Sequence, residues 1–136
     1  MNSGSKSSFA PCPTSIKGVL LLDRRVLLLK NARDEWELPG GRAEKGEDHA
    51  QTLSREFAEE LAINVQMIAH IDSYILEVVP GRHVHIVTYG CTVVGEFRPS
   101  VSNEHLEHCL WPIDRLSELK LPIAYKRSIE AWANTI

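Results

Sequence analysis

Gly41–Ile63 reads GRAEKGEDHAQTLSREFAEELAI, and this stretch contains the pattern that decides the fold. Within it, Asp48–Leu61 has neither glycine nor proline and predicts an α-helix. Its apolar residues recur at helical spacing and form one stripe, at Ala50, Leu53, Phe57 and Leu61. We therefore expect this helix to bury one face against a hydrophobic core.

Three glutamates lie beside that stripe. At 100° per residue, Glu56, Glu59 and Glu60 fall within an arc of about 100°, outside the apolar face. Like charges at these spacings destabilise a helix, so their presence needs a reason. Mg²⁺ prefers carboxylates, carbonyls and phosphate oxygens as ligands. The pattern by itself leaves two interpretations open, a site for a divalent cation and a solvated acidic face.

The stretch resembles the box of the Nudix hydrolases, G-x5-E-x7-R-E-U-x-E-E-x-G-U, where U is aliphatic or aromatic. Eight of its nine specified positions match, at Gly41, Glu47, Arg55, Glu56, Phe57, Glu59, Glu60 and Ile63. The preceding Trp36–Gly41, WELPGG, is a usual lead-in for that family. The departure is Ala62, which stands where the family has a glycine that ends the helix with a positive φ. We expect the left-handed residue to shift to Asn64, which tolerates that conformation better.

The rest of the chain predicts mixed strands around the internal helix and a helix at the end. The resemblance implies an α/β (α+β) fold, a Nudix-type α/β/α sandwich with a mixed central sheet. We expect a flexible N-terminal leader over residues 1–13 and the Nudix domain over residues 14–136. The predicted strands are Ile16–Leu22 and Val26–Lys30 in a hairpin, then Val65–Asp72, Tyr74–Val79 and Val84–Val94; helices are predicted at Ile113–Leu119 and Ile123–Ala133.

The family resemblance also implies an activity, the hydrolysis of a nucleoside diphosphate linked to another moiety, assisted by Mg²⁺ or Mn²⁺. Carried over by position, the metal ligands would be Glu56, Glu59, Glu60 and the carbonyl of Gly40. Arg55 would orient the glutamates through salt bridges, and Glu47 would brace the loop and the helix. The catalytic base stays open between Glu56 and a later loop, where Glu104 is the first choice and Glu107 the second.

The substrate is also left open. It is a nucleoside or deoxynucleoside triphosphate, ADP-ribose, a nucleotide sugar or a dinucleoside polyphosphate. Residues that could bind it are Arg25, Arg33, Trp36 and Gly41. A second hypothesis is a nucleotide-sensing module that has lost catalysis; the intact Arg55, Glu56, Glu59 and Glu60 favour the enzyme. An isoprenoid diphosphate isomerase ranks last, because no cysteine supports it near the expected strand.

Composition limits the partners and the compartment. The 136 residues include 15 basic and 18 acidic side chains, and this net charge of −3 argues against general binding to nucleic acid. The longest apolar stretches have four residues, so no membrane span is expected. Three scattered cysteines predict neither disulfides nor a zinc site and fit the reducing cytoplasm. The partner is a small-molecule nucleotide derivative, and a homodimer is left open.

Overall fold

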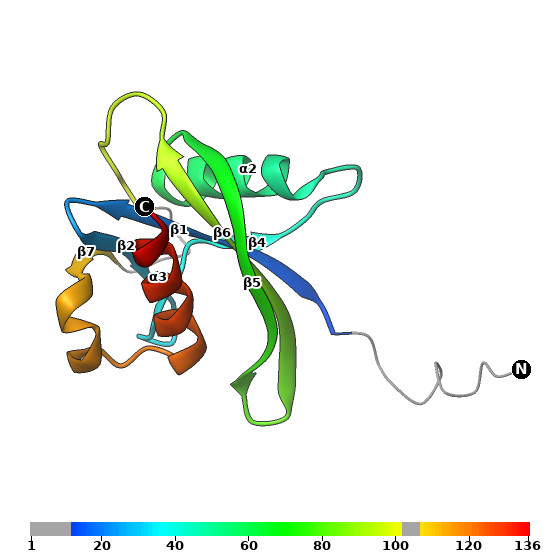
Figure 1. Ribbon diagram of the computed structural model, residues 1–136. Helices are drawn as coiled ribbons and strands as arrows, with labels where there is room; N and C mark the ends of the chain where they lie inside the picture. The colour runs from blue at the N-terminus through cyan, green and yellow to red at the C-terminus, as the bar shows by residue number, and fades with distance from the viewer. Residues whose placement is uncertain (1–11, 102–106) are drawn as a thin grey trace, which may run out of the picture.

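One mixed β-sheet lies between two helices in the computed structural model, which describes residues 12–101 and 107–136 (Figure 1). The helices are α2 (His49–Leu61) and α3 (Ile123–Thr135), with a 3₁₀ helix, η1 (Ile113–Glu118), before α3. The strands are β1 (Thr14–Leu22), β2 (Arg25–Lys30), β3 (Trp36–Glu37), β4 (Gly40–Arg42), β5 (Val65–Val79), β6 (Arg82–Val93) and β7 (Glu107–Pro112).

The sheet runs in the order β3-β2-β1-β6-β5, with β7 paired to β2 and β4 paired to β1. β1 and β6 are parallel, and the other strand pairs are antiparallel. The predicted hairpin between β1 and β2 is confirmed. Its two turn residues, Asp23 and Arg24, have φ values of 50° and 57°, as in the tight turns that suit twisted strands.

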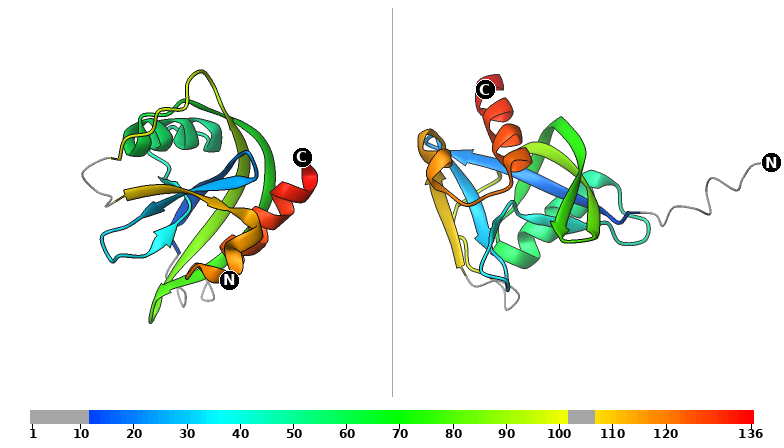
Figure 2. Two further views of the ribbon diagram at one scale, coloured as in Figure 1. Left: turned by 90° about the vertical axis from the view of Figure 1, so that its left-hand side faces the viewer. Right: turned by 90° about the horizontal axis from the view of Figure 1, so that it is seen from below.

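Alternating side chains give the sheet two cores. Leu27 and Leu29 pack with Phe57 of α2. Their neighbours Val26 and Leu28 belong to the second core, which α3 covers with residues that include Ile129 and Trp132. Because successive side chains of a strand point to opposite faces, α2 and α3 lie on opposite sides of the sheet, as Figure 2 shows. The predicted α/β/α sandwich with a mixed sheet is thus confirmed.

One predicted boundary is wrong. Val65–Asp72 and Tyr74–Val79 form a single strand, β5, because Ser73 pairs with Val87 of β6 and continues the ladder. Three register shifts bend this long strand. The two helices predicted near the end are confirmed as η1 and α3.

The end of α2 also differs from expectation. Ala62 itself adopts the left-handed conformation, with a φ of 58°, so the shift to Asn64 does not occur. The amide of Ala62 donates to the carbonyl of Ala58 at 3.0 Å, and that of Ile63 donates to Phe57 at 3.4 Å. These bonds close the helix and let the side chain of Ile63 enter the core at once. The unfavourable φ of an alanine is therefore offset by burial of the next residue.

Residues 1–11 of the leader predicted over residues 1–13 lie outside the described residues. The carbonyl of Pro13 accepts a hydrogen bond of 2.8 Å from the amide of His85. The chain is therefore joined to the sheet just before β1 begins. Within residues 12–101 and 107–136, no helix has both the length and the apolar composition that a membrane crossing needs.

Candidate active site

A glycine turn places the start of β4 against the carboxylates of α2. Gly40 has a φ of 140°, and a Cβ there would overlap the carbonyl oxygen of Ile16 on β1. A Cβ on Gly41 would overlap the carboxylate of Glu56. Only residues without a side chain allow both approaches. The Gly40-Gly41 pair is therefore the reason that the Glu56 carboxylate can lie directly against the backbone of β4.

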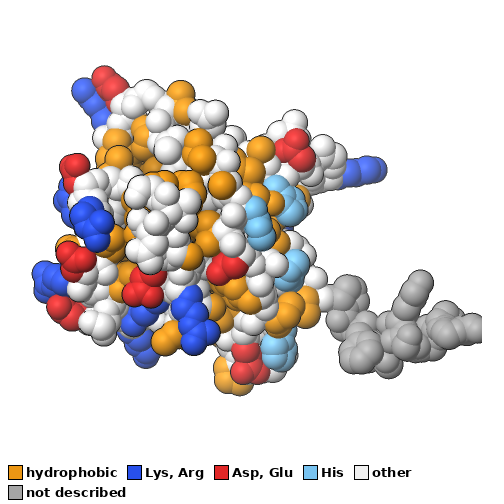
Figure 3. Space-filling view, viewed as in Figure 1, with side chains coloured by type: hydrophobic (Ala, Val, Ile, Leu, Met, Phe, Trp, Pro, Cys, Tyr) orange, Lys and Arg blue, Asp and Glu red, His pale blue; other side chains and the backbone are white. Residues whose placement is uncertain are grey.

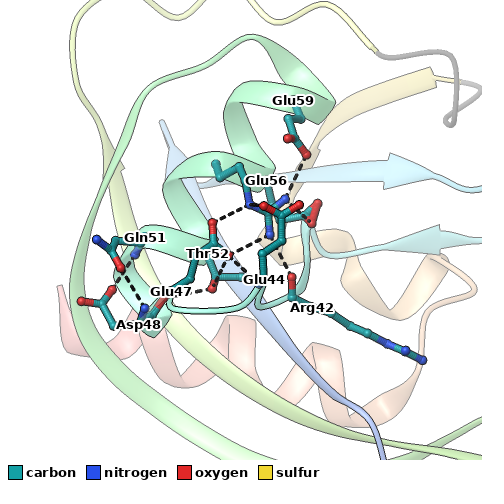
Figure 4. Close-up of polar contacts among 9 residues, drawn as sticks. Arg42, Glu44, Glu47, Asp48, Gln51, Thr52, Glu56 and Glu59 are labelled. Carbon is teal, nitrogen blue, oxygen red and sulfur yellow. Dashed lines mark hydrogen bonds and ion pairs between the residues drawn. The ribbon is translucent and has the colours of Figure 1, made fainter.

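Arg55 holds the acidic side chains around this turn, among them Glu47, Glu56 and Glu59, which Figure 4 labels. Its guanidinium donates to Glu47 at 2.6 and 3.0 Å, to Glu56 at 3.2 Å and to Glu59 at 3.0 Å. A further bond of 2.9 Å reaches the carbonyl of Arg42 in β4. One planar group with five donors can satisfy all these acceptors at once, which a lysine could not do. Arg55 thus ties the helix to the loop before it.

Glu47 is the most strongly held of these carboxylates. Besides Arg55, it accepts hydrogen bonds from the amide of Glu44 at 2.8 Å and from the hydroxyl of Thr52 at 3.1 Å. The Arg55 bond and these backbone and hydroxyl donors lower the pKa of Glu47 to about 2. A group so fully engaged fixes the loop and the first turns of α2, where Asp48 and Gln51 form a reciprocal cap.

Glu60 lies on the inner side of the acidic flank, and it is 7% exposed. Its carboxylate accepts a hydrogen bond of 3.0 Å from the amide of Gly40. Burial raises its pKa to about 8, although the charge of Lys17 and the Gly40 bond oppose that shift. The expectation that all three glutamates lie outside the buried face is thus wrong for Glu60, because the neighbouring strands cover this side of the helix.

The predicted metal ligands gather around the glycine turn but are not arranged as a ready-made cation site. Glu60 and Glu56 contact Gly40 and Gly41, respectively, whereas the Glu59 side chain is 59% exposed. Among the described residues, no three histidine, cysteine or carboxylate side chains converge as a metal site would require. Arg55 bonds to two of the predicted ligands in this conformation.

A pocket of about 760 Å³ opens on the face of the sheet that α3 covers, and none of the predicted metal ligands lines it. It contains two of the predicted substrate-binding residues, Arg33 and Trp36, and the ammonium of Lys30 lies 4.8 Å from the centre of the Trp36 ring. Its walls come from separate segments, at residues 30–31, 33–37, 76–78, 119–122 and 125. The space can hold a group of nucleoside size with apolar, aromatic and charged contacts.

The other predicted residues lie elsewhere. Arg25 follows the β1–β2 turn and pairs with Asp23 at 3.9 Å, and neither residue lines the pocket. Glu107 begins β7, where it pairs in register with Lys30. Glu104 lies outside the described residues, so its predicted role as a base has no structural counterpart.

Sequence reasoning missed two buried residues, Lys17 and Tyr125. Lys17 is buried in β1 and interacts electrostatically with Glu37, Glu56 and Glu60. Tyr125 of α3 lines the pocket and is also among the neighbours of Lys17. Lys17 could have been noticed as a charged residue within the apolar run of β1. The sequence contains no comparable indication for Tyr125.

A family model described as a NUDIX domain matches residues 13–132. The chain is similar to a MutT Nudix hydrolase from Burkholderia pseudomallei, with 24% identity, a TM-score of 0.77 and coverage of 90% of this chain and 98% of that one. It is also similar to the E. coli dihydroneopterin triphosphate pyrophosphohydrolase, with 22% identity, a TM-score of 0.77 and coverage of 91% of this chain and 97% of that one. A third similar structure is an ADP-ribose pyrophosphatase from Streptococcus suis, with 17% identity, a TM-score of 0.70 and coverage of 89% of each chain. No curated protein gives a significant match.

Proposed function

We propose that this chain, which belongs to the Nudix family of phosphoanhydride hydrolases, is a pyrophosphohydrolase that needs Mg²⁺ or Mn²⁺. Its substrate is a nucleoside diphosphate linked to another moiety, within the class of nucleoside triphosphates, ADP-ribose and nucleotide sugars. The observation that carries this proposal is the Glu56 carboxylate held against the Gly40-Gly41 turn, with Glu60 on the same turn and Glu59 linked through Arg55.

The residues at this turn suit a hard divalent cation. Glu56, Glu59, Glu60 and the carbonyl of Gly40 offer only oxygen donors, which Mg²⁺ and Mn²⁺ prefer. The buried Glu60 carboxylate also favours a nearby positive charge, because burial opposes its ionisation. When bound, such an ion would neutralise diphosphate charge and lower the pKa of a coordinated water molecule.

The chain's own residues would then position the reaction. Arg55 would move from its bonds with Glu56 and Glu59 while Glu47 keeps the guanidinium anchored. Glu56, whose side chain is 15% exposed, is in a position to accept a proton from the attacking water. The alternative bases, Glu104 and Glu107, stay open beside it.

The pocket would hold the nucleoside or the group linked to it. Trp36 offers an aromatic surface, and Lys30 and Arg33, which pair with Asp34 and Glu35, would exchange these partners for phosphate or ribose oxygens. Glu37 lines the pocket and lies three residues before Gly40 in the chain, and we propose that the phosphates of a substrate in the pocket extend from there toward the glycine turn. The similar proteins described above are named for different substrates, so none of those substrates is preferred for this chain.

Removal of the metal is the test of this function. We expect that dialysis against EDTA stops hydrolysis of a panel of nucleoside triphosphates, ADP-ribose and nucleotide sugars, and that Mg²⁺ or Mn²⁺ restores it. Phosphate or nucleoside monophosphate release is the measurement, and Zn²⁺- and Ca²⁺-loaded samples are the controls. Turnover that continues without metal would contradict the proposal. Nucleotide binding without turnover on the whole panel would instead favour the sensing module.

A further inference from the structure

One wall of the pocket lacks a hydrophobic core of its own. Residues 31 and 33–37 all line the pocket. Because Lys30 of β2 pairs in register with Trp36 of β3, the chain reverses direction within residues 31–35. None of the side chains of residues 31–35, all of which the structure describes, is buried. Burial of apolar surface therefore cannot hold this wall in shape.

The side chain of Asn31 holds the wall through hydrogen bonds instead. Its oxygen Oδ1 accepts from the backbone amides of Arg33 at 2.9 Å and Glu35 at 3.1 Å. Its nitrogen Nδ2 donates to the carboxylate of Glu37 at 3.2 Å. This orientation of the amide group satisfies all three partners, because only the oxygen can accept and only the nitrogen can donate. An asparagine that accepts from backbone amides further along the chain forms an Asx turn, which takes the place of regular structure.

The backbone of Asn31 closes the same loop. Its N–H donates to the carbonyl of Glu35 at 2.8 Å, and its carbonyl accepts from the amide of Asp34 at 2.9 Å. Asp34 has a φ of 64°, a left-handed conformation that aspartate tolerates better than most residues. Together with the side-chain bonds, these contacts fix the path of the chain from the end of β2 to the start of β3.

That path determines where the charged and aromatic groups of the wall lie. Lys30 pairs with Asp34 at 3.3 Å, and its ammonium lies 4.8 Å from the centre of the Trp36 ring. Arg33 pairs with Glu35 at 2.9 Å. The side chains of Asp34, Arg33 and Glu35 are each at least half exposed, and exposed ion pairs contribute little to stability. The ion pairs therefore follow from the shape of the loop and do not create it.

We propose that Asn31 is a positioning residue, whose side-chain amide holds the 31–37 wall in the shape that binds the substrate. The inference rests on the proposed function, because it takes the pocket as the place of the nucleoside or of the group linked to it. A wall that is already ordered spares the ligand the cost of ordering it. Since none of the predicted metal ligands lines the pocket, a loosened wall is expected to weaken binding and to leave the chemical step unchanged.

Variants of Asn31 in the full chain test the proposal. Asn31→Ala removes all three side-chain bonds, whereas Asn31→Asp keeps the acceptor for the two backbone amides and loses the donor to Glu37. Binding of AMP, GMP, CMP, UMP and ADP-ribose without metal is followed by NMR titration, which also reports on the amides of residues 31–37. With Mg²⁺, kcat and KM are measured on the best substrate of the panel. Hydrogen exchange measures the order of the loop.

Asn31→Ala is expected to raise Kd and KM about tenfold or more and to change kcat by less than about threefold, because only the ordering of the wall is lost. Exchange of the Arg33 and Glu35 amides is expected to become about tenfold faster or more, since they lose their acceptor. Asn31→Asp is expected to stay within about threefold of wild type in Kd and KM, because the Asx turn is kept.

Gly95→Ala is the control for stability alone. Gly95 has a φ of 86°, nothing lies within 4 Å of a Cβ built there, and the residue does not line the pocket. The substitution is expected to lower the unfolding temperature through its disfavoured φ and to leave Kd and KM within about twofold of wild type.

A folded Asn31→Ala with wild-type Kd and KM would overturn the proposal, and so would a loss of kcat at unchanged KM. An Asn31→Asp variant as weak as Asn31→Ala would also contradict it, because the bonds to the backbone amides would then not matter. If Asn31→Ala does not fold, Asn31→Ser, which keeps one acceptor, is expected to raise KM and is judged by the same criteria.

The failure of this inference is distinguishable from the failure of the proposed function. A wild type that hydrolyses a member of the panel but binds none of the five titrated ligands would overturn the role of Asn31 and leave the function standing. A wild type that binds one of these ligands but hydrolyses nothing would refute the proposed function, and the Kd values of the Asn31 variants would still decide the inference.

Discussion

Glu59→Gln is expected to lower kcat by about a hundredfold or more while the folded state stays intact, because it removes a charged oxygen ligand of the proposed metal and leaves the shape unchanged. The Glu59 side chain is 59% exposed and contributes no buried packing, so the circular dichroism spectrum should match that of the wild type. The measurement is kcat at saturating Mg²⁺ and substrate, at neutral pH.

Glu44→Gln is the matched control for this variant. Glu44 also pairs with Arg55, at 3.5 Å, and its side chain is 67% exposed, but it is not among the proposed ligands. We expect kcat within about threefold of wild type, since one exposed ion pair contributes little. Wild-type turnover in Glu59→Gln, or an equal loss in both variants, would count against a role of Glu59 in binding the metal.

Gly40→Ala is expected to cost about 3 kcal/mol or more of the free energy of unfolding, because it combines a disfavoured φ with a backbone overlap. The φ of 140° is one that side-chain-bearing residues rarely adopt, and the new Cβ would overlap the carbonyl oxygen of Ile16. The carbonyl oxygen of Ile16 belongs to the backbone and cannot move aside as the end of a flexible side chain could. β1 and β4 would therefore have to separate. Urea unfolding followed by circular dichroism measures the loss.

Gly46→Ala separates the two causes. Gly46 has a φ of 86°, and nothing lies within 4 Å of a Cβ built there. It therefore carries the conformational penalty without the overlap, and we expect a loss of about 1 to 2 kcal/mol. Equal losses in the two variants would mean that the contact between β4 and β1 does not limit stability.

Much of the site could be predicted from the sequence because its parts are local. The capped helix, the glycine pair and the acidic flank lie within one continuous stretch, and helical spacing places Glu56 and Glu59 outside the apolar stripe. Arg55 lies next to Glu56 and four residues before Glu59, so these two bonds follow from the same periodicity, whereas its bonds with Glu47 and with the carbonyl of Arg42 depend on how the loop folds back.

The burial of Glu60 and of Lys17 could not be predicted in this way. Glu60 is covered because β4 returns to β1 at Gly40, and that pairing depends on the register between distant strands. The charge of Lys17 interacts with carboxylates of β3 and α2, which are separated along the chain by β4 and the loop that follows it. A pattern within one strand contains no information about such neighbours.

Two further differences arise from tertiary contacts that the sequence pattern did not reveal. β5 continues through Ser73 because a polar residue can point outward from an edge strand without interrupting its backbone pairing. Ala62 keeps the left-handed cap because Ile63 must enter the core directly after it. In both cases tertiary packing decided against the intrinsic preference of one residue. The pocket could not be predicted from the sequence either, because its walls come from five separate segments.

The central claim is that the carboxylates at the Gly40-Gly41 turn bind a divalent cation together with a diphosphate. A crystal structure with Mg²⁺ and α,β-methylene-ADP tests it most directly. We expect Mg²⁺ at about 2.1 Å from oxygens of Glu56 and at least one of Glu59 and Glu60, with the Arg55 bonds to its ligands released and the diphosphate on the same ion. A bound nucleotide with Arg55 still bonded to Glu56 and Glu59 and no ion at these oxygens would contradict the claim.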